Sequence, residues 1–313
     1  MNGELFATVK DIAEYMKEHK KALFDENPMM MTEERHEVSQ VVATASRYQG
    51  LKFFGVVSEW DKDTTKQFAA ITVEVEPSVR LVIFRGTDDT LIGWKEDFLM
   101  TYSPLIAAQT DAKEYLAKQA SLFDGDLMVS GHSKGGNLAI YAAATQAEDV
   151  QLRIVDIFCF DSPGLHRSVL ETKGYKNIVP LAMRYIPQDS LVGLMLESEV
   201  PYVIVKSNAT GAMQHSAMTW EIEDGQFIKM EKLTKNSQLN DQTFKKWTES
   251  VSDEELELFW NVFFELLFSV GIDTVNDLYG QFMHYVQEFL KAAGEMDEEK
   301  RELLTRIALL LVS

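Results

Sequence analysis

The residues best suited to chemistry lie in the segment Gly131–Gly135, whose sequence is Gly-His-Ser-Lys-Gly. Its serine, Ser133, comes after an apolar run that predicts a strand and before an alanine-rich run that predicts a helix. A serine at such a strand-to-helix turn is held at strained backbone angles with its hydroxyl exposed. Glycines two residues before and two residues after it remove side chains that would collide across the turn. The segment therefore predicts a nucleophilic serine, with an ordinary glycine-rich turn as the alternative.

A nucleophilic serine needs donors for the negative charge that develops on the carbonyl oxygen under attack. The N–H of Lys134 is one candidate, because it lies at the positive end of the predicted helix, directly after the serine. Thr87 is the second candidate, since it follows the apolar strand-like run Arg80–Phe84 and can donate through both its N–H and its hydroxyl. A plain turn at the end of a strand is the alternative explanation for Gly86 and Thr87.

The turn at Ser133 resembles the nucleophile elbow of α/β-hydrolases, in which the serine is followed along the chain by an acid and then by a histidine. Three histidines follow Ser133 in this sequence. His215, in a loop after the last strand of the expected main body, is the predicted general base. His166 precedes any acid that would keep the order, and His284 lies within a predicted C-terminal helix.

Two aspartates stand at the ends of predicted strands and compete for the role of the acid. Asp161 follows the strand-like run Ile154–Phe160, and Asp189 follows the run Leu181–Ile186. In α/β-hydrolases the acid is expected two strands beyond the elbow strand, and Leu181–Ile186 is the second. This count predicts that Asp189 orients His215. A turn-forming role is the alternative, because an aspartate at a strand end often bonds the backbone.

Four separated motifs resemble, in this order, the class 3 lipase family of α/β-hydrolases. They are Phe84–Thr87 (FRGT), Trp94-x-x-Asp97, Gly131–Gly136 (GHSKGG), and Asp189 with His215. The resemblance spans roughly residues 81–220 and is greatest to an uncharacterised bacterial branch whose members also carry a lysine after the serine. It implies an α/β-hydrolase fold with a mostly parallel central sheet.

For the site, the resemblance implies Ser133 as the nucleophile, with Asp189 as the acid and His215 as the base. It implies oxyanion donors at Thr87 and Lys134. It also implies that the segment after Thr87, which carries Trp94 and Asp97, is lid-like. Two features depart from the family, since typical members have leucine at the position of Lys134 and most are secreted.

Composition narrows the partners and the compartment. A net charge of -19 argues against nucleic acid and anionic membrane surfaces as partners. A single cysteine excludes an intrachain disulfide framework and favours a reducing compartment. With no secretory signal and no apolar run as long as a membrane span, the sequence predicts a cytoplasmic protein without stable membrane insertion. The scattered histidines and the missing phosphate-binding motifs predict that no metal and no cofactor is used.

The chain is expected to have two parts. Residues 1–236 would hold N-terminal helices and the hydrolase core, which alternates strands and helices. Residues 237–313 would form an all-helical C-terminal appendix, because a capping box at Ser252 and Glu255 opens a helix and the glycines at 271 and 294 end helices.

Together these patterns predict a serine hydrolase that cleaves carboxylic esters of lipids or other small acyl compounds through an acyl-enzyme intermediate. A thioesterase or acyltransferase with the same triad is one alternative. A non-catalytic protein that binds a lipid or a partner in the same pocket is another. The sequence leaves acyl chain length, head group and oligomeric state open.

Overall fold

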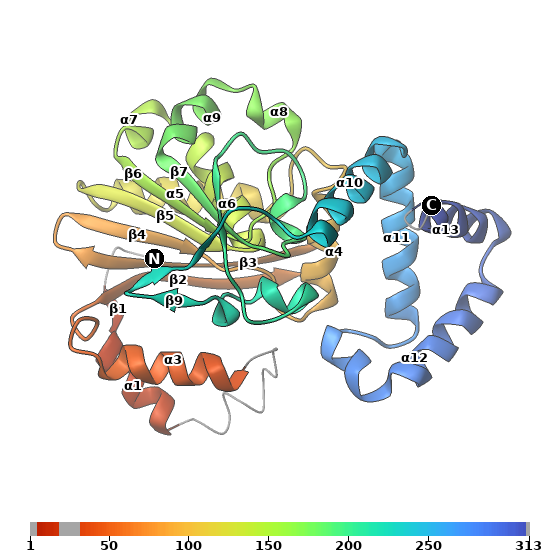
Figure 1. Cartoon of the computed structure of the whole chain (residues 1–313), viewed down its shortest axis with the longest axis horizontal. Coiled ribbons are helices and arrows are strands. Elements are labelled where there is room, and N and C mark those ends of the chain that lie inside the picture. The colour runs from red at the N-terminus through yellow and green to blue at the C-terminus, as the bar shows by residue number, and fades with distance from the viewer. Residues whose placement is uncertain (1–4, 19–31, 311–313) are drawn as a thin grey trace.

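The computed structural model describes residues 5–18 and 32–310, and its centre is a nine-stranded sheet (Figure 1). The strand order is β1-β2-β3-β4-β5-β6-β7-β8-β11, in which β4 to β8 run parallel and the outer strands pair antiparallel. The predicted α/β class with a parallel centre is therefore confirmed. The strands are β1 (Leu5–Thr8), β2 (Lys52–Asp61), β3 (Lys66–Glu76), β4 (Val79–Phe84), β5 (Asp126–His132), β6 (Ile154–Phe160), β7 (Ala182–Pro187), β8 (Tyr202–Val205) and β11 (Lys229–Met230).

The register of the parallel strands brings their carboxyl ends to one edge of the sheet. Phe84 at the end of β4 pairs with Gly131 of β5, and Gly131 pairs in turn with Cys159 of β6. The residues that follow these three strands are therefore neighbours, although they are far apart in the sequence. Ligands of parallel sheets bind at such carboxyl ends, so this edge is where the site is expected.

Helices cover the sheet and connect its strands. The helix after Ser133, α6, contacts β4, β5 and β6, and α5 lies beside α6 and contacts β3. Alanines of α6 are buried against the sheet, and their small size lets the helix lie close to it. The helices before residue 234 are α1 (Val9–Glu18), α3 (Thr32–Thr44), α4 (Leu91–Leu99), α5 (Ala107–Ser121), α6 (Lys134–Ala144), α7 (Glu148–Gln151), α8 (Arg167–Leu170) and α9 (Lys173–Ile178).

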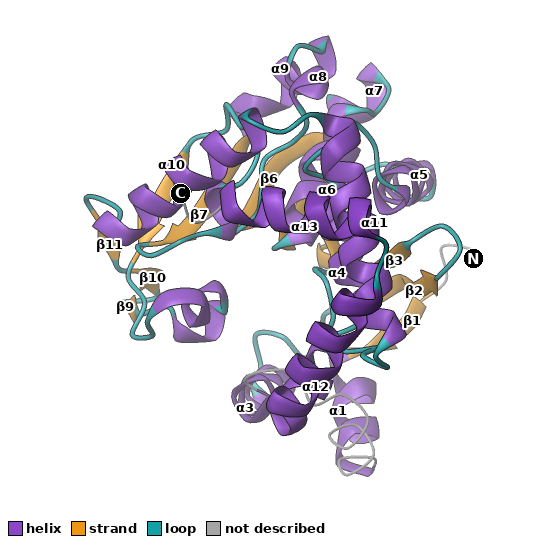
Figure 2. Cartoon of the chain, turned by 90° about the vertical axis from the view of Figure 1, so that its right-hand side faces the viewer, coloured by secondary structure: helices purple, strands orange, loops and turns teal. Residues whose placement is uncertain are grey.

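The C-terminal part is helical, with α10 (Lys235–Glu249), α11 (Asp253–Ser269), α12 (Val275–Glu295) and α13 (Glu298–Leu310). The capping box predicted at Ser252 and Glu255 opens α11, as expected. These helices build a second apolar core that also includes Leu91 and Tyr102 from the main body. In both views α4 lies between the sheet and α11 (Figure 1, Figure 2). A separate domain beginning at residue 237 stays a prediction.

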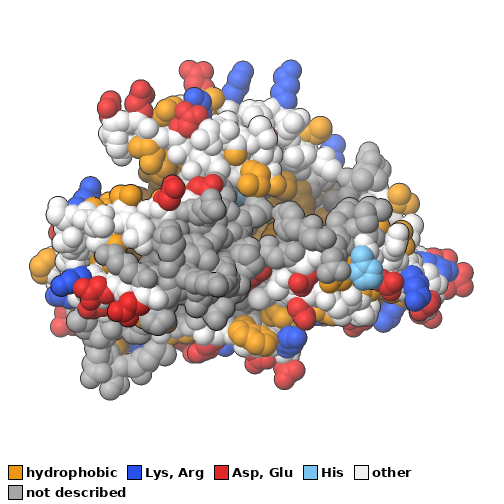
Figure 3. All heavy atoms as spheres, turned by 90° about the horizontal axis from the view of Figure 1, so that it is seen from below, with side chains coloured by type: hydrophobic (Ala, Val, Ile, Leu, Met, Phe, Trp, Pro, Cys, Tyr) orange, Lys and Arg blue, Asp and Glu red, His pale blue; other side chains and the backbone are white. Residues whose placement is uncertain are grey.

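Charged side chains lie around the outline of the molecule. On the face seen from below, acidic and basic side chains stand at both ends and also along the upper and lower edges (Figure 3). Among the helices of residues 5–18 and 32–310, none combines the length and the apolar character that a membrane crossing requires.

Candidate active site

Ser133 stands at the turn between β5 and α6 in a strained conformation, with φ 57° and ψ −133°. Such angles are uncommon for a residue with a side chain and occur where the surrounding structure enforces them. The turn is too tight for a side chain at Gly131, since a Cβ atom there would lie 2.1 Å from the backbone carbon of Gly135. The predicted strand-to-helix turn at Ser133 is therefore present, and the spacing of the glycines follows from this close approach.

The predicted base, His215, has a carboxylate partner, but it is Asp161. Nδ1 of His215 donates to Oδ2 of Asp161 over 2.7 Å. His215 ends the short helix η3 (Gly211–His215), and Asp161 directly follows β6, the strand next to the elbow strand. The prediction that Asp189 orients His215 is therefore wrong, because the carboxylate that reaches the imidazole comes from the first strand after the elbow.

The carboxylate of Asp161 is held from its other side. Its Oδ1 accepts hydrogen bonds from the Ser190 hydroxyl at 2.5 Å and from the Gly193 N–H at 3.1 Å. The residue is 1% exposed and has a positive φ of 39°, a conformation that aspartate tolerates better than most residues. With both oxygens engaged, this carboxylate is fixed in orientation before any substrate binds.

Asp189 bonds two other residues, one of which begins the short helix that carries His215. Its Oδ1 accepts a hydrogen bond from the Thr234 hydroxyl, and its Oδ2 accepts one from the N–H of Gly211 over 3.2 Å. Thr234 is the N-cap of α10, and Gly211 begins the helix that carries His215. Asp189 therefore links the loop that carries His215 to the C-terminal helices, and the imidazole of His215 bonds Asp161 instead.

His132, the residue before Ser133, packs against His215. Its ring lies 4.5 Å from the ring of His215, centroid to centroid, and its Nε2 donates to the backbone oxygen of His215 over 2.6 Å. Burial lowers the pKa of His132 to about 4, with a smaller contribution from the nearby His215. His132 is therefore neutral at pH 7. The sequence motifs do not single out His132, although it lies inside the segment Gly131–Gly135.

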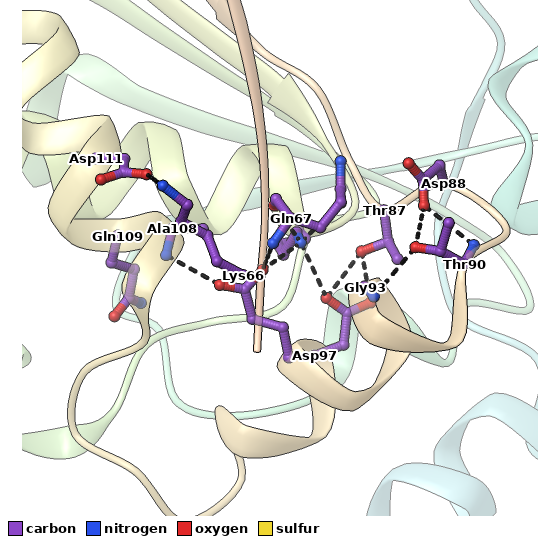
Figure 4. A network of polar contacts seen from close by, with 12 residues as sticks. Lys66, Gln67, Thr87, Asp88, Thr90, Gly93, Asp97, Ala108, Gln109 and Asp111 are labelled. Atoms are coloured by element: carbon purple, nitrogen blue, oxygen red, sulfur yellow. Dashed lines mark hydrogen bonds and ion pairs between the residues drawn. The ribbon is translucent and has the colours of Figure 1, made fainter. Parts of the chain in front are cut away.

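The loop between β4 and α4, residues 85–90, is the predicted oxyanion loop and lies against the turn at Ser133. A Cβ atom on Gly86 would come within 2.7 Å of the backbone oxygen of His132 and 3.1 Å of the Ser133 Cβ. Thr87 is the next residue, and its hydroxyl points toward Asp97 of α4 (Figure 4). That hydroxyl donates to the carboxylate of Asp97, with oxygen–oxygen distances of 2.7 and 2.8 Å. The backbone N–H of Thr87 is thus the donor that remains for an oxyanion.

Asp97 lies in a partly buried position on α4, and its carboxyl group has a raised pKa. Burial raises its pKa from 3.8 to about 6, although the nearby Lys134 and the hydrogen bond from Thr87 act in the opposite direction. At neutral pH the carboxylate is ionised and accepts a hydrogen bond from the Thr87 hydroxyl. The other expected residue of this segment, Trp94, faces outward and is 42% exposed.

The side chain of Lys134 is completely buried, which the sequence did not reveal. Its ammonium group donates to Glu96 Oε2 at 2.8 Å and to the backbone and side-chain oxygens of Gln67 at 2.8 and 2.9 Å. The carboxylate of Glu96 is likewise unexposed. The ion pair therefore joins the first residue of α6 to β3 and α4, while the backbone N–H of Lys134 stays at the elbow.

Other expected features fall outside this cluster. His166 caps α8 with its side chain, and His284 lies exposed on α12. Within the described ranges, no group of three or more histidine, cysteine, aspartate or glutamate residues is arranged to hold a metal ion. Among the described residues, no hydrogen bond joins Ser133 Oγ to His215. Catalytic hydrogen bonds are often long without substrate and tighten only when it is bound.

A family model described as Mbeg1-like matches residues 42–265, which is more than half of the chain. No curated protein matches the sequence. Among solved structures, the M37 lipase is 13% identical, with a TM-score of 0.38 over 51% of this chain and 62% of that one. A fungal lipase in an inhibitor complex is 16% identical, with a TM-score of 0.38 over 51% and 66%. Rhizomucor miehei lipase in its propeptide complex is 15% identical, with a TM-score of 0.36 over 51% and 58%.

These structural matches cover less than two thirds of the length of each lipase. At such TM-scores the likeness is too loose to carry an argument about activity. What the site can do follows from its own geometry.

Proposed function

This chain belongs to the Mbeg1-like family, and we propose that it is a serine hydrolase of the α/β-hydrolase type that cleaves carboxylic esters. The observation that carries the proposal is the 2.7 Å hydrogen bond from His215 to the buried carboxylate of Asp161, together with a strained serine directly after β5, the strand next to the one that Asp161 follows. A histidine oriented in this way by a carboxylate is the arrangement that activates a serine. The resemblance of the sequence motifs to class 3 lipases supports the same assignment.

In the proposed reaction, Ser133 Oγ attacks the carbonyl carbon of the ester, and its proton passes to Nε2 of His215. Asp161 stabilises the imidazolium that forms, because its carboxylate accepts a hydrogen bond from the Nδ1–H group while the proton stays on the imidazole. The tetrahedral oxyanion is bound by the backbone N–H groups of Thr87 and Lys134. When the intermediate collapses, the alcohol leaves with the proton from His215. Water then repeats the sequence on the acyl-enzyme and releases the acid.

Two features of the site prepare the base for this role. The hydrogen bond from His132 to the backbone of His215 fixes the position of the turn that carries the imidazole. Because the lowered pKa of His132 keeps it neutral, no second positive charge opposes the imidazolium that develops on His215. The Asp161 carboxylate, held by Ser190 and Gly193, supplies the negative charge. The proposed substrates are small acyl esters, including those of lipids.

Hydrolysis of p-nitrophenyl esters with acyl chains of two to twelve carbons, in parallel with the matching acyl thioesters, tests this proposal. We expect saturable hydrolysis of at least one ester by the wild type, and a loss of about 10⁴-fold or more in kcat for Ser133→Ala. Ser130→Ala is the matched control, because this serine lies three residues earlier, on β5, and its hydroxyl donates to the backbone oxygen of Phe158. A folded Ser133→Ala variant with wild-type rates would refute the assignment. Faster turnover of thioesters would instead identify a thioesterase.

A further inference from the structure

Helix α4 follows the oxyanion loop, where the sequence resemblance implies a lid, but its inner face is bonded to the body. Glu96, which is unexposed, accepts hydrogen bonds from the N–H of Gln67 at 3.0 Å and from the N–H of Ala108 at 2.9 Å. The same carboxylate pairs with the ammonium group of Lys134 at 2.8 Å. Three donors from three different elements therefore converge on one side chain of α4.

The start of α4 and its side away from the sheet contact the C-terminal part of the chain. The N–H of Leu91 donates to the backbone oxygen of Asp273 over 2.8 Å, and Thr90 forms an antiparallel bridge with Thr274. Phe98 stacks on Trp260 of α11 with ring centroids 3.9 Å apart. These contacts belong to the second apolar core, which is built from side chains of both parts.

Movement of α4 away from the elbow would break both sets of contacts together. Lys134 would keep a buried positive charge without its counter-ion, and the N–H groups of Gln67 and Ala108 would lose their acceptor. Unpaired buried charges and buried donors without acceptors are among the most unfavourable features in a protein interior. Opening would also expose the Phe98–Trp260 stack to water. A segment held in this way lacks the weak local contacts from which lids are made.

We propose that α4 is a fixed wall of the active site and does not open as a lid, so the protein acts on acyl esters dissolved as single molecules without activation by a lipid–water interface. This inference rests on the proposed esterase function, and it adds the physical state of the substrate to that function. The Lys134–Glu96 pair and the C-terminal helices both keep α4 in place, because each contacts one side of this helix.

The kinetic test follows the rate of tributyrin hydrolysis as the substrate concentration rises through its solubility limit. We expect a hyperbolic curve that saturates without a step at the limit. A rise of about tenfold or more at the point where droplets form would overturn the proposal. If no ester is hydrolysed on either side of the limit, it is the esterase function that fails, and the position of α4 is then decided by the second test.

The second test measures hydrogen–deuterium exchange of the α4 amides and needs no catalysis, so it is also performed on Ser133→Ala. We expect α4 to be equally protected with and without phosphatidylcholine vesicles. Glu96→Gln should raise exchange in α4 by about tenfold or more, because the variant removes the charge that Lys134 requires. Lys95→Gln, a change of one charge on the same helix, should leave exchange unaltered. Vesicle-induced deprotection of α4, or wild-type protection in Glu96→Gln, would contradict the fixed wall.

Discussion

The substitution Asp161→Asn separates the two aspartates that compete for the role of the acid. In the structure, Oδ1 of Asp161 accepts from two donors, the hydroxyl of Ser190 and the N–H of Gly193. An asparagine at this position must keep its amide oxygen toward those donors, so its NH₂ group faces Nδ1 of His215. The imidazole then has to carry its proton on Nε2, where it can no longer accept the proton of Ser133.

The expected cost is that of a wrong histidine tautomer, about 10⁴-fold in kcat, which corresponds to about 5.5 kcal/mol of transition-state stabilisation. The matched control is Asp189→Asn, which keeps one acceptor for Thr234 or Gly211 and should lose less than about tenfold in kcat. Both variants are compared with the wild type in kcat and KM on one short-chain p-nitrophenyl ester, after circular dichroism has shown that each is folded. A large loss in Asp189→Asn with a small loss in Asp161→Asn would refute the role of Asp161.

Three further predictions concern the residues around the oxyanion loop. Lys134→Met should lower the free energy of unfolding in urea by about 3–5 kcal/mol, because Glu96 is left buried without its partner; a loss below about 1 kcal/mol would contradict this. Thr87→Ser should keep most of the wild-type kcat, whereas Thr87→Ala should lose roughly 10- to 100-fold, because the anchor to Asp97 positions the loop; equal kcat values would show that the anchor is dispensable. The pKa of Asp97 is raised to about 6, so the folded protein binds this proton more tightly than the unfolded chain and loses stability as the pH rises from about 4 to 6. The free energy of unfolding of Asp97→Asn, relative to that of the wild type, should therefore rise by up to about 3 kcal/mol between pH 4 and pH 7 in urea titrations. If the difference between the two proteins is the same at every pH, the raised pKa is wrong.

The parts of the site that the sequence predicted are set by local sterics. The elbow at Ser133 needs glycine where the backbone of Gly135 comes within 2.1 Å of a Cβ position, so its spacing can be recognised without a structure. The capping box of α11 is equally local, since its two side chains lie three residues apart. The parallel centre of the sheet follows from apolar strand runs that alternate with helical patterns.

The parts that the sequence did not predict depend on how distant segments pack. Asp161 and Asp189 both follow strands, and only the path of the loop that carries His215 decides which carboxylate the imidazole meets. The number of strands between Ser133 and each aspartate does not determine the path of this loop. The burial of Lys134 depends on Glu96, 38 residues away, and a lysine in a helical turn normally extends into solvent. The bacterial branch and the cytoplasmic location stay predictions.

The most direct test of the proposed activity is covalent labelling of the native protein with a fluorophosphonate, followed by peptide mass spectrometry. The geometry around Ser133 predicts one adduct, located on the peptide that contains Ser133. It should be absent from Ser133→Ala and from denatured protein, and strongly reduced in His215→Ala, because only a serine activated by an oriented histidine reacts with such a probe. A folded wild-type protein that remains unlabelled, or a Ser133→Ala variant labelled as fully as the wild type, would contradict the proposal.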